Sequence, residues 1–390
     1  MKRGEIMLVI KGGKIYTMAQ KKVIEEGLIF IEKGKIVDIV ERAEIPKDVE
    51  VIDAEGKYIF PGFIDAHCHI GLFEEGVGAI GEDGNEWTDP ITPHLRAIDA
   101  VNPSDIAFKE ALEGGVTAVF TGPGSANVIG GQSAALKTYG RVVDEMIIKS
   151  PAGLKIAFGE NPKRVYGEQK KSPATRMATA ALLRETIYKA RNYKQKKEKT
   201  KEGEVFEIDI KMEILCEVLE KKLPLRAHAH RADDIMTAIR IAKEFGVDLV
   251  IEHCTEGHII ADKIAEYGVP AVVGPSLTSR SKYELKDLTF KTPGILANKG
   301  VKVAIMTDHP VIPIKYLPLL AALAVKEGMR EEDALLAITK NAAEIIGISD
   351  KVGSLEKGKD ADIVIWDRFP FDLMAKPMMV LINGEVVLKK

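Results

Sequence analysis

The amino-acid sequence predicts a (β/α)8 barrel, or TIM barrel, that carries a small β-sandwich domain built from both chain ends. The middle of the 390-residue chain alternates short apolar runs with longer amphipathic segments, which is typical of buried parallel strands covered by helices. Both ends instead hold β-branched runs broken by glycine, such as "GLIFIEKGKIVDIVE" and "PMMVLINGEVVLKK". We therefore expect the sandwich to comprise residues 1–57 and 351–390, and the barrel to comprise residues 58–350.

The composition is that of an ordinary globular protein, with 46% hydrophobic residues, 29% charged residues and a net charge of −3. This charge predicts neither a nucleic-acid partner nor a membrane partner, and no run approaches the roughly 18 apolar residues of a transmembrane helix. The stretch "MKRGEIMLVIKGGKIYTMAQ" lacks the apolar core of a signal peptide. An odd number of cysteines, three, argues against a disulfide scaffold, so we expect a cytoplasmic protein.

Seven apolar runs predict strands of the barrel, and residues 122–152 leave room for an eighth. Their number fits a closed barrel better than an open sheet, although the pattern alone is compatible with both. Segments such as "ADDIMTAIRIAKEFG" predict the covering helices. In chain order the runs read "FPGFIDAHCH", "GVTAVFTGPG", "GLKIAFGE", "LPLRAHAH", "VDLVIEHC", "VPAVVGPS" and "VKVAIMTDH".

Histidine and aspartate gather at the C-terminal ends of four of these runs. Alternate side chains of an extended strand share a face, so His67 and His69 can reach the same metal ion. The C-terminal ends of all barrel strands meet at one face, which is where active sites form. The pattern therefore favours a metal site over a set of separate buried histidines. The side chains at these ends are His67, His69, His228, His230, His253, Asp308 and His309.

Imidazoles together with a carboxylate suit Zn²⁺ first, with Mn²⁺, Fe²⁺, Co²⁺ or Ni²⁺ as the alternatives. Such an ion lowers the pKa of a bound water from about 16 towards about 7. We expect Asp308 to act as a general base towards this water and then as an acid towards the leaving nitrogen. The alternative role for Asp308 is that of a helix N-cap.

At these positions the chain resembles the amidohydrolase superfamily of metal-dependent hydrolases. The resemblance rests on "PGFIDAHCH", "GVTAV", the two later histidine strands and "TDH" in this order, and on "GSLEKGKDADIVIWD" leading back into the sandwich. It extends over essentially the whole chain and is strongest for the imidazolonepropionase-related branch, which includes dipeptidases. The resemblance implies a homo-oligomer whose metal ligands are His67, His69, His228, His253 and Asp308.

Two ligand assignments stay open. His228 and His230 share a strand face, and the resemblance favours His228 as the ligand, which leaves His230 to contact the substrate or the metal. A second ion needs a bridging anion, for which "GLKIAFGENPKRVYG" offers Lys155 and Glu160. Lys155 resembles the carbamylated lysine of two-metal relatives, and a lysine inside a strand is costly unless it is modified or paired. Glu160 has a shorter stem but lies at the rim, so the sequence allows one ion or two.

Loop residues provide the candidates for substrate binding. The segment at 121–140 is rich in Gly, Ser, Asn and Gln, which suits close approach to a ligand, and it offers Asn127 and Gln132. Arg231 can hold a substrate carboxylate through two N–H groups. Weaker candidates are Arg176, His258 and, within a segment at residues 85–99 that can form a lid, His94.

The predicted reaction is hydrolysis of a C–N bond in a small molecule, namely a cyclic amide, an N-acyl compound or a dipeptide. A deaminase is the nearest alternative, but deaminases of the superfamily carry a glutamate three residues after the strand-five histidine, where this chain has Arg231. A non-catalytic scaffold barrel is the third possibility. Such relatives typically lose metal ligands, whereas this chain retains every ligand position that the resemblance implies.

Overall fold

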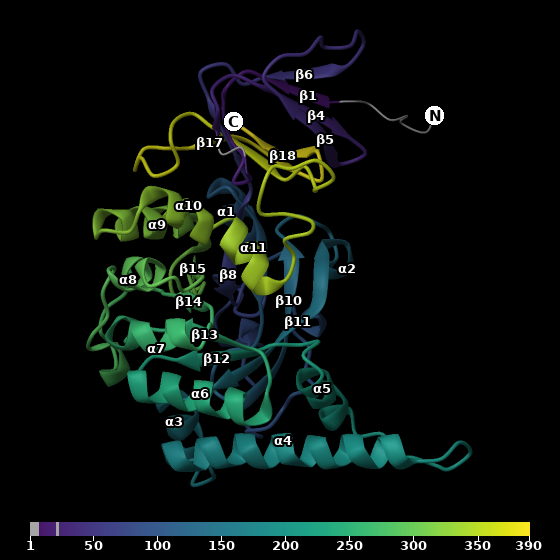
Figure 1. Cartoon of the computed structure of the whole chain (residues 1–390), viewed down its shortest axis with the longest axis vertical. Helices are drawn as coiled ribbons and strands as arrows, with labels where there is room; N and C mark the ends of the chain where they lie inside the picture. Colours follow the sequence, from purple (N-terminus) through teal and green to yellow (C-terminus); the bar gives the residue numbers. More distant parts are fainter. Residues whose placement is uncertain (1–7, 21–22) are drawn as a thin grey trace.

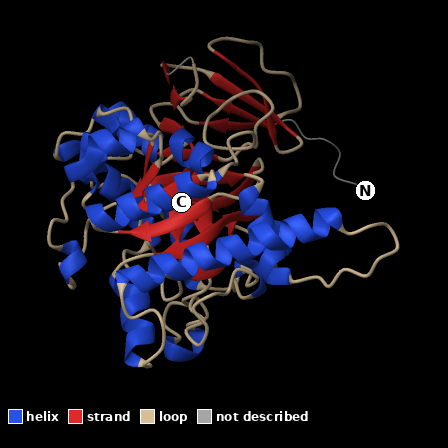
Figure 2. Cartoon of the chain, turned by 60° about the horizontal axis from the view of Figure 1, so that its bottom comes forward, coloured by secondary structure: helices blue, strands red, loops and turns tan. Residues whose placement is uncertain are grey.

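The computed structural model describes residues 8–20 and 23–390. It shows an eight-stranded barrel surrounded by helices, with two further β-sheets at one end of the molecule (Figure 1). Figure 2 shows the barrel strands enclosed by helices and the other sheets set apart from them. The predicted TIM barrel with a β-domain from both chain ends is therefore confirmed. Within the described residues, no helix has the length and apolar character needed to cross a membrane.

The sandwich consists of two sheets. Its strands are β1 (Leu8–Lys11), β2 (Lys14–Tyr16), β3 (Val23–Ile24), β4 (Leu28–Glu32), β5 (Lys35–Val40), β6 (Glu50–Asp53), β7 (Tyr58–Pro61), β16 (Ile363–Trp366), β17 (Pro377–Ile382) and β18 (Glu385–Lys389). One sheet has the order β5-β4-β1-β6 and the other the order β18-β17-β16-β7-β2-β3. The antiparallel pairing of β16 with β7 joins the two ends of the chain. Buried isoleucines such as Ile10, Ile29 and Ile363 fill the space between the sheets.

The barrel strands follow one another around the barrel in chain order. They are β8 (Phe63–Cys68), β9 (Val116–Thr121), β10 (Ile129–Lys137), β11 (Ile147–Ala157), β12 (Leu225–Ala229), β13 (Leu249–His253), β14 (Ala271–Val273) and β15 (Val303–Ile305). The ring closes just beyond β15 and at β8, where the Asp308 N–H donates to the His67 carbonyl (3.2 Å) and the His69 N–H donates to the His309 carbonyl (2.8 Å). Closure therefore fixes the backbone of three candidate ligands.

One strand differs from the predicted parallel pattern, because β10 runs antiparallel to both β9 and β11. Only residues 122–128 connect β9 to β10. A parallel connection needs about a dozen residues or more, so this short link allows only a return in the opposite direction. The loop at 122–128 consequently lies at the same end of the barrel as the histidines.

The segment at residues 85–99 does not form the free lid that the sequence suggests. It is fastened along β10, where the Thr92 N–H donates to the Ile129 carbonyl (2.9 Å) and the Gln132 N–H donates to the Leu95 carbonyl (2.8 Å). Gly131 permits this close approach, since its φ is 135° and a Cβ atom there would lie 2.7 Å from the Leu95 oxygen.

Helices cover the outside of the barrel. They are α1 (Ile106–Glu113), α2 (Val143–Met146), α3 (Glu160–Glu168), α4 (Arg176–Lys199), α5 (Ile210–Leu219), α6 (Ala232–Phe245), α7 (Ala261–Glu266), α8 (Thr292–Asn298), α9 (Leu317–Lys326), α10 (Glu331–Ala337) and α11 (Lys340–Ile346). Short 3-10 helices lie at Gly78–Gly81, Ala97–Asp99, Gly257–Ile260, Tyr283–Leu285 and Ile314–Tyr316.

Helix α6 shows why the sequence folds in this way. Its apolar residues recur at helical spacing, and Ile235, Ile239 and Phe245 are buried on the side that packs against the barrel. Two acidic residues in its first turn favour the positive end of the helix dipole. The helix ends at Gly246, which has a left-handed φ of 68°. Packing of α6 against the barrel therefore fixes the position of the last residues of β12, the strand that precedes this helix.

Candidate metal centre

Five histidines and one aspartate from four strands converge at the C-terminal end of the barrel. The first group consists of His67 on β8, His69 just after it and Asp308 after β15, and their ligand atoms all lie within 4.8 Å of one another. The Nε2 atoms of His67 and His69 each lie 3.3 Å from Oδ1 of Asp308. This arrangement is the one expected when two imidazoles and a carboxylate surround a common centre.

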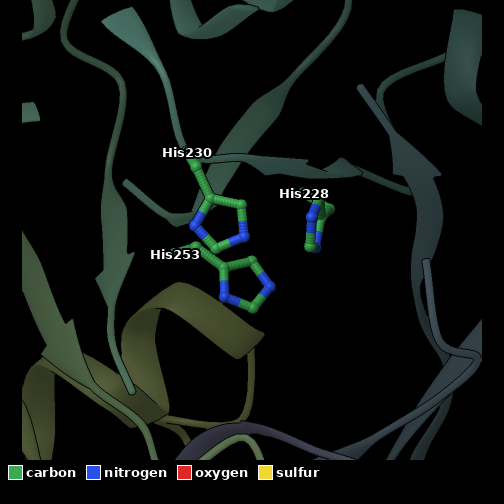
Figure 3. Close-up of side chains that lie close together, drawn as sticks. All are labelled: His228, His230 and His253. Carbon is green, nitrogen blue, oxygen red and sulfur yellow. The ribbon is translucent and has the colours of Figure 1, made fainter. Parts of the chain in front are cut away.

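The second group consists of His228, His230 and His253, whose ligand atoms also lie within 4.8 Å of one another. Figure 3 shows these three imidazoles close together at the ends of their strands, and their ring centroids are 4.2–4.7 Å apart. The two groups are neighbours, because the ring centroids of His67 and His253 are 5.5 Å apart. The geometry therefore provides two adjacent positions for a cation.

Hydrogen bonds fix the orientation of several of these rings. Nδ1 of His69 lies 2.7 Å from the Gly122 carbonyl, and Nδ1 of His253 lies 3.0 Å from the Gly274 carbonyl. Because a carbonyl only accepts, Nδ1 carries the hydrogen in both rings and Nε2 is left with a free lone pair. Metal-binding histidines typically have this arrangement, in which the remote nitrogen donates to a carbonyl or carboxylate.

The described structure leaves other nitrogens of the cluster without a hydrogen-bond partner. Both ring nitrogens of His228 and Nε2 of His230 are buried and unpaired among the described residues. Nearly all buried polar atoms in proteins have a partner, so such atoms indicate a ligand or an ion. The donor set, nitrogen with carboxylate oxygen, fits a first-row divalent metal.

Electrostatics keep these groups in the forms that bind metals. Burial, assisted by the neighbouring imidazoles, lowers the pKa of His228 and His230 well below the usual range. Burial also lowers the pKa of His253 to about 3, so these three rings are neutral at pH 7. Burial alone would raise the pKa of Asp308, but His253 and the two histidines of the first group hold it well below its usual value.

Two residues of the cluster have an unusual backbone conformation. His253 and Asp308 have φ angles of 69° and 54°, in the left-handed region that favours glycine. A non-glycine residue there costs about 1–3 kcal/mol and persists where the surrounding structure enforces it, which is frequent at functional sites. Both conformations turn their side chains towards the other ligands.

Lys155 lies beside the first group, inside the barrel. Its Nζ atom donates to Oε2 of Glu252 (2.5 Å) and lies 3.4 Å from Nε2 of His67. Glu252 on β13 also accepts from Nε of Arg226 (2.8 Å), and its Oε1 lies 3.0 Å from Nδ1 of His67. The structure therefore brings Lys155 to the ligands through a network of fully buried charges.

Glu160 does not reach the ligands. It begins helix α3, and its backbone N–H donates to Oε1 of Glu284 (2.5 Å). It is absent from the side chains that line the cavity above the histidines. Of the two predicted bridging residues, Lys155 therefore lies beside the first group of ligands, whereas Glu160 has already passed into a helix.

Two predicted substrate contacts, Asn127 and Gln132, are not among the residues that line this cavity. The Asn127 amide is fully engaged, since it donates to Thr92 Oγ1 (2.7 Å) and accepts from the Tyr166 hydroxyl (2.5 Å). The Gln132 amide donates to the Pro93 carbonyl (3.1 Å). Both side chains hold the chain around β10 in place instead of facing a ligand.

The predicted contacts Arg231 and His258 also lie outside the cavity. Arg231 donates through two nitrogens to Asp233 (2.8 and 2.9 Å), so its guanidinium is already paired. Nδ1 of His258 lies 3.0 Å from Thr292 Oγ1 and 3.2 Å from the Thr255 carbonyl. The weaker candidate Arg176 pairs with Asp234 (3.0 Å). Of the predicted substrate contacts, His230 is the one that the structure places at the cavity.

The sequence analysis missed several residues. Arg226 and Glu252 each stand two or fewer positions before a candidate ligand, and a charged residue inside an apolar strand was the available signal. Asn161, in the first turn of α3, and the loop residue Lys282 line the cavity but carry no pattern that separates them from ordinary surface positions. Only the tertiary structure brings them to the site.

Comparisons with known proteins agree with this geometry. Residues 58–387 match the profile of the amidohydrolase family. The chain is 25% identical to an imidazolonepropionase of Mesorhizobium japonicum, over 92% of the chain and 91% of that protein. It is 27% identical to "Amidohydrolase tasK" of Hapsidospora irregularis over 92% of the chain, which spans only 39% of that longer relative. A crystal structure of an amidohydrolase from Thermotoga maritima superimposes with a TM-score of 0.95 at 51% identity, covering 98% of this chain and all of that one (100%).

Proposed function

The chain belongs to the amidohydrolase family, and from this premise we propose that it hydrolyses a C–N bond in a small cyclic amide, N-acyl compound or dipeptide with the help of divalent metal ions. One observation carries the proposal. Two neighbouring groups of ligand atoms, one of His67, His69 and Asp308 and one of the three remaining histidines, lie at the end of the barrel, and the buried Lys155 lies 3.4 Å from His67 of the first group. Zinc is the metal that this donor set suits best.

The charges of the site support a carbamylated Lys155. Without metal, the positive charges of Lys155 and Arg226 balance the negative charges of Glu252 and Asp308. Each divalent ion adds two positive charges to this buried region. The Lys155 ammonium first loses one proton to solvent; addition of CO2 to the neutral amine then forms an N–C bond and releases a second proton, which gives a carbamate anion. Lys155 thereby changes from a cation to an anion, and this offsets one ion.

The chain's own residues have distinct roles in this proposal. A divalent metal held by these ligands supplies a water with a pKa lowered towards about 7 and polarises a carbonyl oxygen. Asp308 is ionised, so its carboxylate accepts the proton of the attacking water and later delivers it to the leaving nitrogen. Nδ1 of His230 lies 2.8 Å from the Thr255 hydroxyl. When that hydroxyl donates, Nε2–H of His230 is free to donate to the substrate carbonyl, and His228 and His253 are the residues that would hold a second ion.

The alternatives have less support. Among the described residues that line the cavity, Asp308 is the only carboxylate, so no second acid is present to protonate a heterocycle as a deaminase requires. A scaffold barrel would not need the buried, unpaired nitrogens of His228 and His230. We further infer a cytoplasmic homo-oligomer, without a nucleic-acid or membrane partner. Its free, buried cysteines Cys68, Cys216 and Cys254 are compatible with a reducing compartment.

The test combines metal analysis with a substrate screen. Protein purified with zinc and bicarbonate is expected to hold about two ions per chain. It is also expected to hydrolyse members of a panel of N-acyl amino acids, dipeptides and cyclic amides. Release of ammonia from aminopurines alone would replace the proposal with a deaminase, and a folded protein that binds no metal would favour the scaffold.

A further inference from the structure

A cavity of about 350 Å³ lies above the histidine cluster, a size that suits a small ligand. The lining includes apolar side chains, among them Phe73, Leu285 and Val311, and the polar side chains of Asn161 and Lys282. Among the described residues that line the cavity, Lys282 is the only lysine or arginine. The cavity therefore presents one fixed cation to whatever it binds.

The protein holds the Lys282 ammonium group in place. Its Nζ atom donates to Oδ1 of Asn161 (3.3 Å) and lies 3.3 Å from Oε2 of Glu284. Glu284 is almost completely buried (1% exposed) and is itself held by the Glu160 N–H and by Arg176. An ammonium group has three hydrogens, so the one hydrogen bond to Asn161 leaves hydrogens that a ligand can accept. The Lys282 side chain remains 25% exposed.

Lys282 and the histidines that would hold a divalent ion line the same cavity. Cations placed around one small cavity repel each other, and an anion between them relieves the repulsion.

We propose that Lys282 anchors a free carboxylate of the substrate, so that the cavity selects small acids over the matching neutral amides. The carboxylate accepts a hydrogen bond from the Lys282 ammonium group. The scissile carbonyl lies over the histidine cluster, and an apolar substituent packs against Phe73 and Val311. N-acyl amino acids and dipeptides with a free carboxyl end have this layout. Only the placement of the scissile bond rests on the proposed function, because carboxylate binding does not require hydrolysis.

Calorimetric titration of the metal-loaded protein with a matched pair of ligands tests this assignment. N-acetyl-L-leucine and N-acetyl-L-leucinamide differ only in the charge of the group that Lys282 would contact. The wild-type protein is expected to bind the acid at least about tenfold more tightly, the effect of one charge-assisted hydrogen bond. Lys282→Met should abolish this preference, whereas Lys282→Arg should retain it. Acetate as a third ligand distinguishes recognition of the whole molecule from binding of any small anion.

Lys286→Met is the matched control, because Lys286 lies in the same loop, is exposed, and packs over Tyr283 outside the cavity. It should keep the full preference for the acid. Equal binding of both ligands to the wild type, no binding of either, or acetate binding as tightly as the acid would overturn the assignment. A preference that survives in Lys282→Met would also overturn it, since the metal itself would then hold the carboxylate.

The outcomes also separate this inference from the proposed reaction. If the acid binds in a way that depends on Lys282 but no C–N bond in the screen is hydrolysed, the proposed reaction is refuted and carboxylate binding by Lys282 is supported. Hydrolysis of acids and amides at equal rates by both wild type and Lys282→Met would support the reaction and refute the anchor.

Discussion

Neighbouring strands β10 and β11 each bury one lysine, at opposite ends of the barrel, and the two sites differ in how completely they are paired. Lys137, at the end next to the sandwich, donates to Asp362 (2.5 Å) and to Asp360 (2.9 Å), and Lys35 also pairs with Asp360. Lys155, below the histidines, shares the single carboxylate of Glu252 with Arg226. The first site is a closed network, whereas the second borders on nitrogens without partners.

This difference separates a structural ion cluster from a functional one. At Lys137, two cations meet two carboxylates, and the cluster joins β10 to the segment that leads into β16. At Lys155, the network ends on His67, and beyond it both ring nitrogens of His228 and Nε2 of His230 have no partner among the described residues. Buried charges that are paired with an opposite charge of the protein have a structural role, whereas buried polar groups without a partner indicate a site for a ligand.

The largest expected effect is the loss of activity when the charge of Asp308, at the histidine end of the barrel, is removed. Asp308→Asn keeps the shape of the side chain but removes both the carboxylate ligand and the proton acceptor. We expect kcat/KM for the best substrate of the screen to fall at least about 1,000-fold, within the range that a positioned acid–base group supplies. The variant should unfold at the same urea concentration as the wild type. Activity within tenfold of the wild type would contradict the role of Asp308.

Loss of Lys137 should instead lower the stability of the protein and leave its activity unchanged. Lys137→Met leaves Asp362 without its cation, and breaking a buried pair costs about 3–5 kcal/mol. We expect the low end, about 3 kcal/mol in the free energy of unfolding, because Lys35 still pairs with Asp360. Urea denaturation measures this loss, and kcat/KM serves as the control and should be unchanged. Unaltered stability would show that the cluster is not structurally important.

The stability deficit of Lys137→Met should depend on pH. Burial alone would raise the pKa of Asp360, but Lys137 and Lys35 hold it below its usual value. A carboxyl whose pKa is lowered by folding contributes stability above the usual pKa of about 3.9 and loses it as the pH falls through the folded value. The part of the deficit that Asp360 carries should therefore be complete from pH 7 down to about 4 and shrink as the pH falls further, through the lowered pKa of folded Asp360. Urea denaturation at several pH values measures this, and a constant deficit would contradict the assignment to Lys137.

A smaller effect is expected from Glu252, which connects Lys155 to His67 without lying in the cavity. Glu252→Gln removes the shared counter-charge of Lys155 and Arg226 and loosens the ring of His67. We expect metal affinity to fall about 10–100-fold, the usual effect of losing a partner behind a ligand. Competition with a chelator measures it. Glu256→Gln is the matched control, since Glu256 is also buried but accepts from the Ala232 N–H instead; equal losses in both variants would refute a specific role.

The sequence was sufficient to predict the barrel and the end at which the histidines lie, because both depend on local patterns. Apolar runs determine the strands, and the C-terminal ends of parallel strands meet at one face whatever the loops do. The antiparallel course of β10 depends on loop length, for which residues 122–128 were the overlooked signal. The roles of Asn127 and Lys282 depend on contacts with distant segments, at Tyr166 and Asn161, which no local pattern specifies.

The choice between Lys155 and Glu160 illustrates the same limit, and it leads to the smallest expected effect. Both residues suit a bridging role in the sequence, yet one faces the interior of the barrel and the other begins a helix. Glu160 contributes its backbone N–H to Glu284, and Glu160→Gln retains that group. We expect kcat/KM and metal content to stay within about twofold of the wild type, as for other substitutions away from a site. Lys155→Met, measured in parallel, should lose at least one bound ion. If Glu160→Gln lost metal while Lys155→Met retained it, the bridging anion would be Glu160. The ion pairs of Lys155 would then be purely structural, like those of Lys137.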